Sequence, residues 1–330
     1  MHCHPYVSHN LLLAAVAALL GISGCSPEPS AALRVGLNAW PGYEFLYLAQ
    51  EKDFYRAEGL TVRLVEFNSL ADARRAYERG QINVLGTTAI EVLQIRDNSP
   101  RAPQIVQVMD YSNGADVILA RPGITNIAGL RGARVGLELA SLGVYVLARG
   151  LEQCGLNLAD VTLVSVDQLA MADVFRKGEL DAIVTYPPVS TMLLRDTQAS
   201  TVFSSTQIPG EVVDVIAVEA EMVTRRAGDV AKLLRAYRRA VAYARQHPAD
   251  AYRIMAAREG ITPDEFCAIL TNDIRMLTEA DQAAYLRPDG KLAAVIDATD
   301  RILRQSGQIK GPDRRANAFT AAFAGTGTSQ

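Results

Sequence analysis

The chain is short of the side chains that most catalytic and metal sites use. Its 330 residues include four histidines, and three of them (His2, His4 and His9) precede position 10. His247 is therefore the only histidine in the rest of the chain, which is too few for a histidine-based catalytic or metal site. No Gly-x-Ser-x-Gly motif and no phosphate-binding loop occurs either. We expect no enzyme activity, no cofactor and no bound metal.

A strong excess of charge of either sign is also missing. The chain has 33 basic and 36 acidic side chains, a formal net charge of -3. Proteins that bind nucleic acids usually carry a basic surface, so we expect no nucleic-acid partner. Aromatic residues make up only 6%, with Trp40 the one tryptophan, but 49% of the residues are apolar. That is enough for a sizeable core, and the length suggests about two domains.

Long apolar runs are absent except near the N-terminus. The run Leu11–Leu20 has ten residues, whereas a membrane-spanning helix needs about 20. Its length suits the hydrophobic region of a signal peptide. The following Ile22-Ser23-Gly24-Cys25 resembles a bacterial lipobox, in which the cysteine receives lipid after cleavage.

We therefore expect residues 1–24 to be a lipoprotein signal peptide, Cys25 to be the lipidation site and residues 25–32 to be a tether. Two acyl chains at Cys25 would hold the protein stably at the membrane, on the periplasmic or cell-surface side. The first ten residues contain no Lys or Arg. A secreted protein cut elsewhere, or a misassigned start, is the alternative.

Cysteines are too few for a disulfide scaffold. Beyond the signal peptide and the lipidation site, only Cys154 and Cys267 remain. They could pair outside the cytoplasm, but each lies in an apolar, helix-like stretch. This setting favours two separately buried free thiols.

Short β-branched runs alternate with amphipathic stretches in the first half of the mature chain. This alternation predicts α/β architecture with parallel strands. The expected strands are 33–38, 61–67 and 82–85, and the expected helices are 43–58 and 71–79.

One pattern occurs twice. Arg34-Val35-Gly36-Leu37 recurs as Arg134-Val135-Gly136-Leu137, and residues 77–83 match residues 175–181 by type. The Arg-to-Gly spacing is 46 residues in the first copy (34 to 80) and 44 in the second (134 to 178). Two matches in the same order predict two lobes of similar design, each with a strand, a helix ending at Gly and another strand. Chance similarity between units of one α/β sheet is the alternative.

Helical patterns replace strand patterns after about Val218. Residues 229–246 repeat apolar side chains at helical spacing, and 292–304 form the last such stretch. We expect this helical segment to pack back on the first lobe. The predicted boundaries are 33–113 plus 216–310 for lobe 1, 114–215 for lobe 2 and 311–330 for a flexible tail.

Ligands of open α/β sheets collect beyond the carboxyl ends of the strands. The polar and aromatic residues at these positions are the candidate ligand-binding residues. They are Asn38, Trp40, Tyr43, Glu44, Asn68, Ser69, Thr87, Thr88, Asp110, Tyr111, Glu138, Ser141, Tyr145, Tyr186 and Asp214.

Each candidate has a simpler structural interpretation. Ser69 and Thr88 could be plain helix caps, and Trp40 could belong to the core. The candidates include several carboxylates but no Lys or Arg. This balance favours a neutral or cationic organic ligand over an anion, with an aromatic or apolar part.

These residues resemble the nitrate/sulfonate/taurine and thiamine-pyrimidine class of solute-binding proteins of ABC importers. The resemblance runs from about Arg34 to Arg304, and its main stretches are 47–62 and 129–136. Asp53 stands where the class usually has Gly, and Glu138-Leu139-Ala140 replaces a turn richer in Gly and Ser. The second departure and the acidic candidates favour a pyrimidine-like ligand over a sulfonate.

The resemblance implies a bilobal, type II periplasmic-binding-protein fold that closes on a small molecule. It also implies an ABC permease with its ATPase as partners of a monomeric protein. A receptor of the same fold that reports ligand occupancy to a membrane signalling protein is the alternative function.

Overall fold

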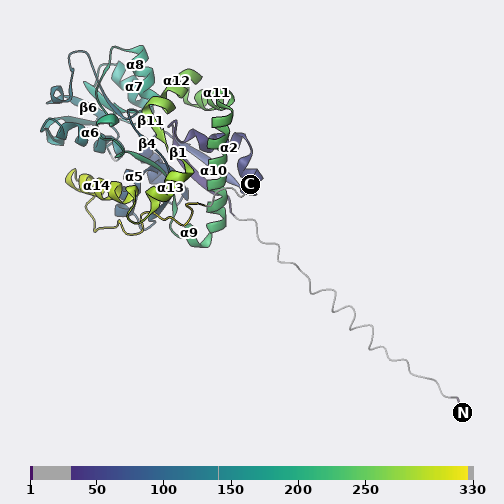
Figure 1. Cartoon of the computed structure of the whole chain (residues 1–330). Helices are drawn as coiled ribbons and strands as arrows, with labels where there is room; N and C mark the ends of the chain where they lie inside the picture. Colours follow the sequence, from purple (N-terminus) through teal and green to yellow (C-terminus); the bar gives the residue numbers. More distant parts are fainter. Residues whose placement is uncertain (3–30, 140, 326–330) are drawn as a thin grey trace. The chain divides into compact units, whose positions relative to one another are not determined.

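The computed structural model describes residues 1–2, 31–139 and 141–325, and the chain from Ala32 onward forms one compact unit (Figure 1). The predicted signal peptide cleavage site and Cys25 lie outside the described residues. Two β-sheets with helices packed around them make up this unit. The predicted lobe boundaries at 113/114 and 215/216 stay a prediction.

The first sheet has six strands in the order β11-β4-β10-β3-β1-β2. Its β1 pairs in parallel with β2 and β3, whereas β10 is antiparallel to both β3 and β4. The strands are β1 (Leu33–Asn38), β2 (Val62–Phe67), β3 (Val84–Thr88), β4 (Pro103–Ser112), β10 (Val213–Glu219) and β11 (Ile274–Met276).

The second sheet has five strands in the order β7-β6-β8-β5-β9. Here β6 is parallel to β7 and β8, and β5 is antiparallel to β8 and β9. The strands are β5 (Val117–Ala120), β6 (Arg134–Leu137), β7 (Thr162–Ser165), β8 (Ala182–Thr185) and β9 (Ser200–Ser204).

The α/β class is confirmed, but neither sheet is purely parallel as expected. Apart from the short β11, the strands that run against the parallel ones are β5 and β10, and each is the first strand after the chain passes from the other sheet. A strand that arrives from the other sheet needs no helical crossover, so it can enter in the opposite direction. The short β11 also corrects the expectation that strands end after Val218.

Helices surround the sheets (Figure 1), and the long α10 packs beside α2 and α3. The α-helices are α2 (Glu44–Glu51), α3 (Phe54–Ala57), α4 (Leu70–Glu78), α5 (Ala89–Asn98), α6 (Leu142–Glu152), α7 (Gln168–Arg176), α8 (Val189–Asp196), α9 (Met222–Arg225), α10 (Ala227–Gln246), α11 (Pro248–Glu259), α12 (Pro263–Ala268), α13 (Glu279–Leu286) and α14 (Lys291–Gln305). Short 3-10 turns lie at Ile127–Leu130, Leu158–Asp160 and Ser205–Gln207, and a π-turn at Ile269–Asp273.

The expected single helix over 43–58 is two helices. Asp53 separates them with a left-handed backbone (φ 57°). Asp tolerates this conformation because its short polar side chain adapts to it, although glycine fits it better. The chain therefore changes direction at Asp53, the position at which the solute-binding class that the sequence resembles usually has Gly.

The repeated sequence marks two equivalent structural units. Both β1 and β6 lie between two parallel neighbours, and each has a glycine at its centre. A β-carbon on Gly36 would lie 2.2 Å from Ile82 Cδ1, and one on Gly136 would lie 2.4 Å from Leu180 Cδ1. Each glycine thus makes room for one apolar side chain: Ile82, which follows α4, beside Gly36, and Leu180, which follows α7, beside Gly136.

The turns after these helices also match. Gly80 and Gly178 both adopt positive φ (74° and 89°), which glycine accommodates without strain. Arg34 donates from Nη2 to the carbonyl of Gly80 at 3.0 Å, and Arg134 donates from Nε to that of Glu179 at 3.1 Å. The arginine opening each repeat therefore anchors the turn of its own unit.

The C-terminal segment is packed, contrary to the expected flexible tail. Phe319 bridges to Ile105 of β4, and Phe323 is buried. The buried Arg96 donates to the carbonyls of Arg314 and Ala316 at 2.7 and 2.5 Å. Residues 311–325 thus pack against the first sheet, through contacts with β4 and with Arg96 of α5.

Cys154 and Cys267 are free thiols, as expected, but each is half-buried rather than buried.

Candidate functional site

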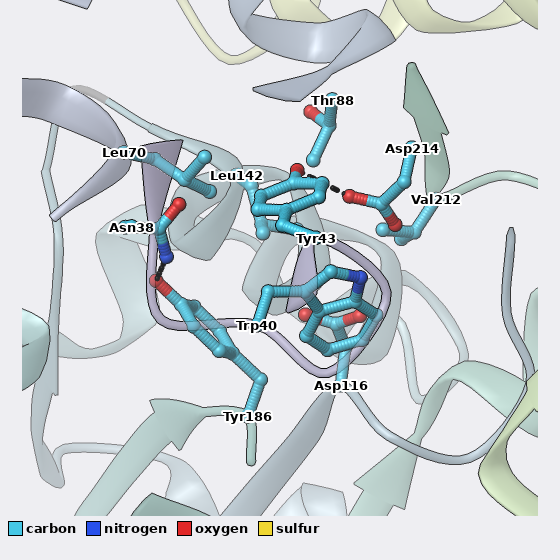
Figure 2. Close-up of a pocket in the computed structure, with 10 residues that line it drawn as sticks. All are labelled: Asn38, Trp40, Tyr43, Leu70, Thr88, Asp116, Leu142, Tyr186, Val212 and Asp214. Atoms are coloured by element: carbon cyan, nitrogen blue, oxygen red, sulfur yellow. Dashed lines mark hydrogen bonds between the residues drawn. The ribbon is translucent and has the colours of Figure 1, made fainter. Parts of the chain in front are cut away.

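A narrow cavity lies where the two sheets face each other, and Figure 2 shows the side chains around it. Loops and helix starts that follow strands of both sheets supply its walls. Ten residues line it: Asn38, Trp40, Tyr43, Leu70, Thr88, Asp116, Leu142, Tyr186, Val212 and Asp214. None of the ten is Lys, Arg or His.

The cavity is nearly closed. Its volume open to the centre of a water molecule is about 10 Å³, which corresponds to about one water. Every lining side chain is buried, with Tyr186 the most exposed at 6%. An organic ligand therefore needs the walls to move apart before it can enter.

Two aromatic side chains from different sheets meet at one wall. The ring of Trp40, after β1, meets the ring of Tyr186, after β8, edge to face, with 5.9 Å between centroids and 81° between planes. Asn38 donates from Nδ2 to the Tyr186 hydroxyl at 3.1 Å (Figure 2). Such rings offer a planar ligand an apolar contact surface.

Asp214 lines the cavity and is one of a pair of buried carboxyl groups, Asp110 and Asp214. Asp214 of β10 accepts a hydrogen bond from the Tyr43 hydroxyl at 2.5 Å (Figure 2). It lies directly across the strand pair from Asp110 of β4. Burial and the charge of Asp110 raise the pKa of Asp214 well above its usual value. Burial also raises the pKa of Asp110 to about 7, although the nearby Asp214 and Trp40 side chains partly oppose this.

Asp116 adds a third buried carboxyl to the lining. Burial raises its pKa to about 7, a hydrogen bond with Ser112 opposes the shift, and the charge of Glu91 adds to it. Its Oδ2 has no hydrogen-bond partner. A buried carboxylate without a cationic partner is costly, so the site favours an incoming positive charge or a bound proton.

Four polar atoms of the lining lack a hydrogen-bond partner of good geometry: Asn38 Oδ1, Trp40 Nε1, Asp116 Oδ2 and Asp214 Oδ2. The amide oxygen of Asn38 is an acceptor, the two Asp oxygens are acceptors when their carboxyl groups are ionised, and Trp40 Nε1 is an N–H donor. Since buried polar groups are normally paired, these atoms suit a ligand that is rich in N–H donors.

Glu138 lies next to the cavity and does not line it. Its Oε1 accepts a hydrogen bond from the backbone N–H of Gln168 at 3.1 Å, at the start of α7. Burial raises its pKa to about 8, and this hydrogen bond partly opposes the shift. A helix start of this kind attracts anions, and here a side chain of the protein already occupies it.

Six of the predicted site residues line the cavity: Asn38, Trp40, Tyr43, Thr88, Tyr186 and Asp214. Asp110, Glu138 and Ser141 are buried beside it. The other six lie outside the lining and have contacts of their own.

Glu44 is buried against Arg258, which donates from Nε at 2.9 Å. Asn68 is exposed, and Ser69 caps α4 through a hydrogen bond from the Asp72 N–H. Thr87 lies inside β3 and Tyr111 is half-buried at the end of β4. Tyr145 donates to Glu211 at 2.8 Å. The structure thus brings none of these six to the lining, and Ser69 fits the helix-cap interpretation.

Sequence reasoning missed Leu70, Asp116, Leu142 and Val212 as lining residues. Leu70 and Leu142 are the first residues of α4 and α6, and each directly follows a predicted residue. Asp116 directly precedes β5, and Val212 directly precedes β10. Leu70, Leu142 and Val212 gave no chemical signal because they are apolar. Asp116 is acidic, but it precedes its strand instead of following one.

Among the residues that the structure describes, no three His, Cys, Asp or Glu side chains are grouped as ligands of a metal ion. Nor does any helix in the described part of the chain combine the length and apolarity needed to cross a membrane.

The fold is shared with proteins of known structure. The alkanesulfonate-binding protein SsuA of Xanthomonas axonopodis pv. citri, solved with MOPS, has a TM-score of 0.74 at 18% identity, over 88% of this chain and 98% of that one. A Candida albicans protein described as having the generic periplasmic binding protein fold has a TM-score of 0.68 at 13% identity, over 88% and 96%. The desulfurization enzyme DszB, in complex with biphenyl-2-sulfinic acid, has a TM-score of 0.62 at 18% identity, over 89% and 98%. The chain therefore has the periplasmic-binding-protein fold.

Curated relatives match over a shorter region. A Brucella abortus (strain 2308) protein with a provisional binding-protein name is 26% identical over 169 residues, or 48% of this chain and 50% of that protein. A 4-amino-5-hydroxymethyl-2-methylpyrimidine phosphate synthase of Aspergillus parasiticus is 26% identical over 164 residues, or 49% and 47%. The chain thus matches about half the length of these relatives.

A family comparison covers more of the chain. Residues 40–251 match the family described as NMT1/THI5 like, and this region includes Trp40, Tyr186 and Asp214 of the cavity. The match spans more than half of the 330 residues. It confirms the resemblance inferred from the sequence. The chain belongs to the NMT1/THI5-like family.

Proposed function

We propose that this protein is a solute-binding protein that works outside the cytoplasm and delivers a small organic ligand to an ABC importer. The ligand is neutral or cationic, and a pyrimidine-like compound is favoured over a sulfonate. Cys25 carries the lipid anchor, and a permease with its ATPase receives the ligand. The observation that carries the proposal is the aromatic and acidic cavity without a basic side chain.

The lining suits an aminopyrimidine in three respects. Trp40 and Tyr186 offer ring surfaces for a planar heterocycle. The unpaired oxygens of Asp116 and Asp214 can accept hydrogen bonds from amino groups. The same carboxylates stabilise a ring that is protonated, because opposite charges attract strongly in a buried site.

A sulfonate finds less support in the same cavity. It would have to lie close to Asp116 and Asp214 without a neighbouring Lys or Arg. Glu138 also already occupies the start of α7, where a helix would otherwise attract an anion. The sulfonate-binding neighbours share the fold with this chain at 18% identity, so their ligands do not decide this one.

The cavity also lacks the parts of an enzyme site. Its lining contains no Cys, His, Lys or Ser. His247 packs instead against the Tyr243 ring, with 4.6 Å between centroids, at the junction of α10 and α11. Nucleophilic or general acid–base chemistry would have to rest on the Asp and Tyr side chains and on Thr88, without a His, Cys or Lys among the lining residues. Ligand capture needs none of these groups.

Thermal unfolding in the presence of candidate ligands tests the proposal. The panel holds aminopyrimidines, betaines, polyamines, taurine, alkanesulfonates and nitrate. A ligand at about 100 times its dissociation constant adds about 2.7 kcal/mol, which raises the Tm by several degrees. We expect this shift with aminopyrimidines or organic cations. A shift with sulfonates alone would contradict the proposed ligand class.

Two variants locate the binding site. Trp40→Ala and Tyr186→Ala each remove an aromatic wall, and we expect affinity for the ligand found to fall about 10- to 100-fold. Tyr252→Ala removes a tyrosine that packs on Phe266, outside the lining, and serves as the control. Unchanged affinity in both cavity variants would place the ligand elsewhere.

A further inference from the structure

Glu91 is a buried carboxylate that connects α5 to the start of α6, and it was not among the candidates read from the sequence. It lies on α5, which follows β3 of the first sheet, and its exposure is 0%. Its Oε1 accepts hydrogen bonds from Ser141 Oγ at 2.7 Å and from the Leu142 backbone N–H at 2.9 Å. Its Oε2 accepts one from the Thr88 hydroxyl. Three donors thus satisfy one buried carboxylate, as burial requires.

Two of these donors, Ser141 and Leu142, lie at the start of α6, the helix that follows β6 of the second sheet. Ser141 is the N-cap residue, but its side chain makes no capping bond to its own helix and donates to Glu91 instead. The first N–H groups of a helix lack partners within it and, with the helix dipole, attract a negative charge. The Glu91 carboxylate therefore fills the position at which α6 would hold an anion.

This position lies directly behind the cavity wall. Thr88 and Leu142, which donate to Glu91, both line the cavity (Figure 2). A ligand with an anionic group would meet the start of α6 at this point. The Glu91 carboxylate already takes the hydrogen bonds that the start of α6 could give to such a group.

The negative charge of Glu91 reaches the other ionisable groups of the cleft. It contributes to the raised pKa values of Asp116, Glu138, Tyr43 and Tyr186. An anionic ligand would join this set of acidic groups without a basic residue in the lining. A neutral or cationic ligand would not meet this repulsion.

We propose that Glu91 is a specificity-determining residue whose carboxylate permanently occupies the anion position at the start of α6 and so excludes anionic ligands from the cleft. This inference rests on the proposed function, because it assumes that ligands bind in the same cavity. The same contacts make Glu91 a link between α5 and the start of α6.

Removing the carboxylate tests the inference, with methanesulfonate as the probe. Glu91→Ala frees the N–H of Leu142 and the hydroxyl of Ser141, and it leaves room for a small anion. We expect its dissociation constant for methanesulfonate, measured by calorimetry, to be at least about tenfold lower than that of the wild type. Glu91→Gln keeps the volume and loses the charge, so a smaller gain is expected. Glu51→Gln removes an exposed charge on α2 and should leave the wild-type value unchanged.

The results separate this inference from the proposed function. A gain in the Glu91 variants supports the inference even if no aminopyrimidine or cation binds to the wild type, which would count against the proposed ligand class alone. Wild-type protein that binds methanesulfonate as tightly as Glu91→Ala would overturn it. So would folded Glu91→Ala and Glu91→Gln proteins that gain no affinity. If only Glu91→Gln folds, its comparison with the wild type decides the matter.

Discussion

At the level of single residues, burial without a cationic partner determines how Asp116 ionises. Its pKa of about 7 compares with an ordinary value near 4. Between these two values the unfolded chain has lost a proton that the folded protein keeps. The free energy of unfolding therefore falls as pH rises through this window, and the loss is complete above about pH 7.

Asp116→Asn removes this proton and with it one contribution to the pH dependence. We expect the stability of the variant, relative to the wild type, to rise by up to ~1.4 kcal/mol per pH unit between pH 4 and 7. Urea unfolding at pH 5, 6, 7 and 8 measures the difference. Asp173→Asn changes an exposed carboxylate and should give a curve parallel to the wild type. A parallel curve for Asp116→Asn would show that this carboxyl does not titrate near neutrality.

The residues of the site differ in how far the sequence could reveal them. Asn38 ends β1 and Tyr186 follows β8, and such positions lie at the cleft in any open α/β sheet. Asp214 lies near the start of β10, which is antiparallel to β3, so it lies opposite Thr88 at the end of β3. Glu91 was hidden because it lies within the first turn of α5, where an acidic side chain is ordinary. Its importance depends on α6, which begins some 50 residues later, and this proximity follows only from the packing of the two units.

At the level of secondary-structure elements, the two copies of the strand–helix–strand unit depend on one close contact. Gly36 in β1 leaves room for Ile82, just as Gly136 in β6 leaves room for Leu180. The repeat was readable from the sequence because this packing is local. The antiparallel direction of β5 and β10 was not readable, since it depends on how the chain passes between the sheets.

Gly36→Ala tests this contact. We expect a loss of about 1–3 kcal/mol in the free energy of unfolding, because the new methyl group overlaps Ile82 Cδ1. Ile82→Val removes that carbon, so Gly36→Ala should cost clearly less in the Ile82→Val background. Gly228→Ala, on α10 with no atom close to the new methyl group, is the control and should cost little. Equal costs of Gly36→Ala in both backgrounds would show that another contact limits the site.

At the level of the whole molecule, the C-terminal segment shows that a polar composition does not by itself predict a flexible tail. Residues 311–325 look like a polar tail, yet Ala318 and Phe323 are buried and Phe319 bridges to β4. Two isolated phenylalanines give no periodic pattern in a sequence. Their burial depends on a surface that β4 and α10 form together, for Arg238 of α10 donates to the Phe323 carbonyl at 2.9 Å.

Arg96 makes this segment a part of the fold. Its guanidinium donates to the carbonyls of Pro103, Arg314 and Ala316, and burial lowers its pKa. Ending the chain after Lys310 removes two of these three acceptors and leaves a buried charge with one. We expect the free energy of unfolding to fall by about 3–5 kcal/mol, the usual cost of breaking a buried charged network on one side.

Thermal unfolding of the shortened chain measures this loss as a Tm that falls by several degrees. Ending the chain after Gly325 instead keeps every one of these contacts and should leave the Tm unchanged. Arg96→Met in the chain that ends after Lys310 removes the unpaired charge, so it should recover part of the loss, whereas in the full-length chain it should destabilise. If the shortened chain unfolded at the wild-type temperature, the segment would contribute nothing to the stability of the fold, and the prediction would be wrong. The sign reversal of Arg96→Met between the two chains separates the effect of the buried charge from that of the lost apolar contacts.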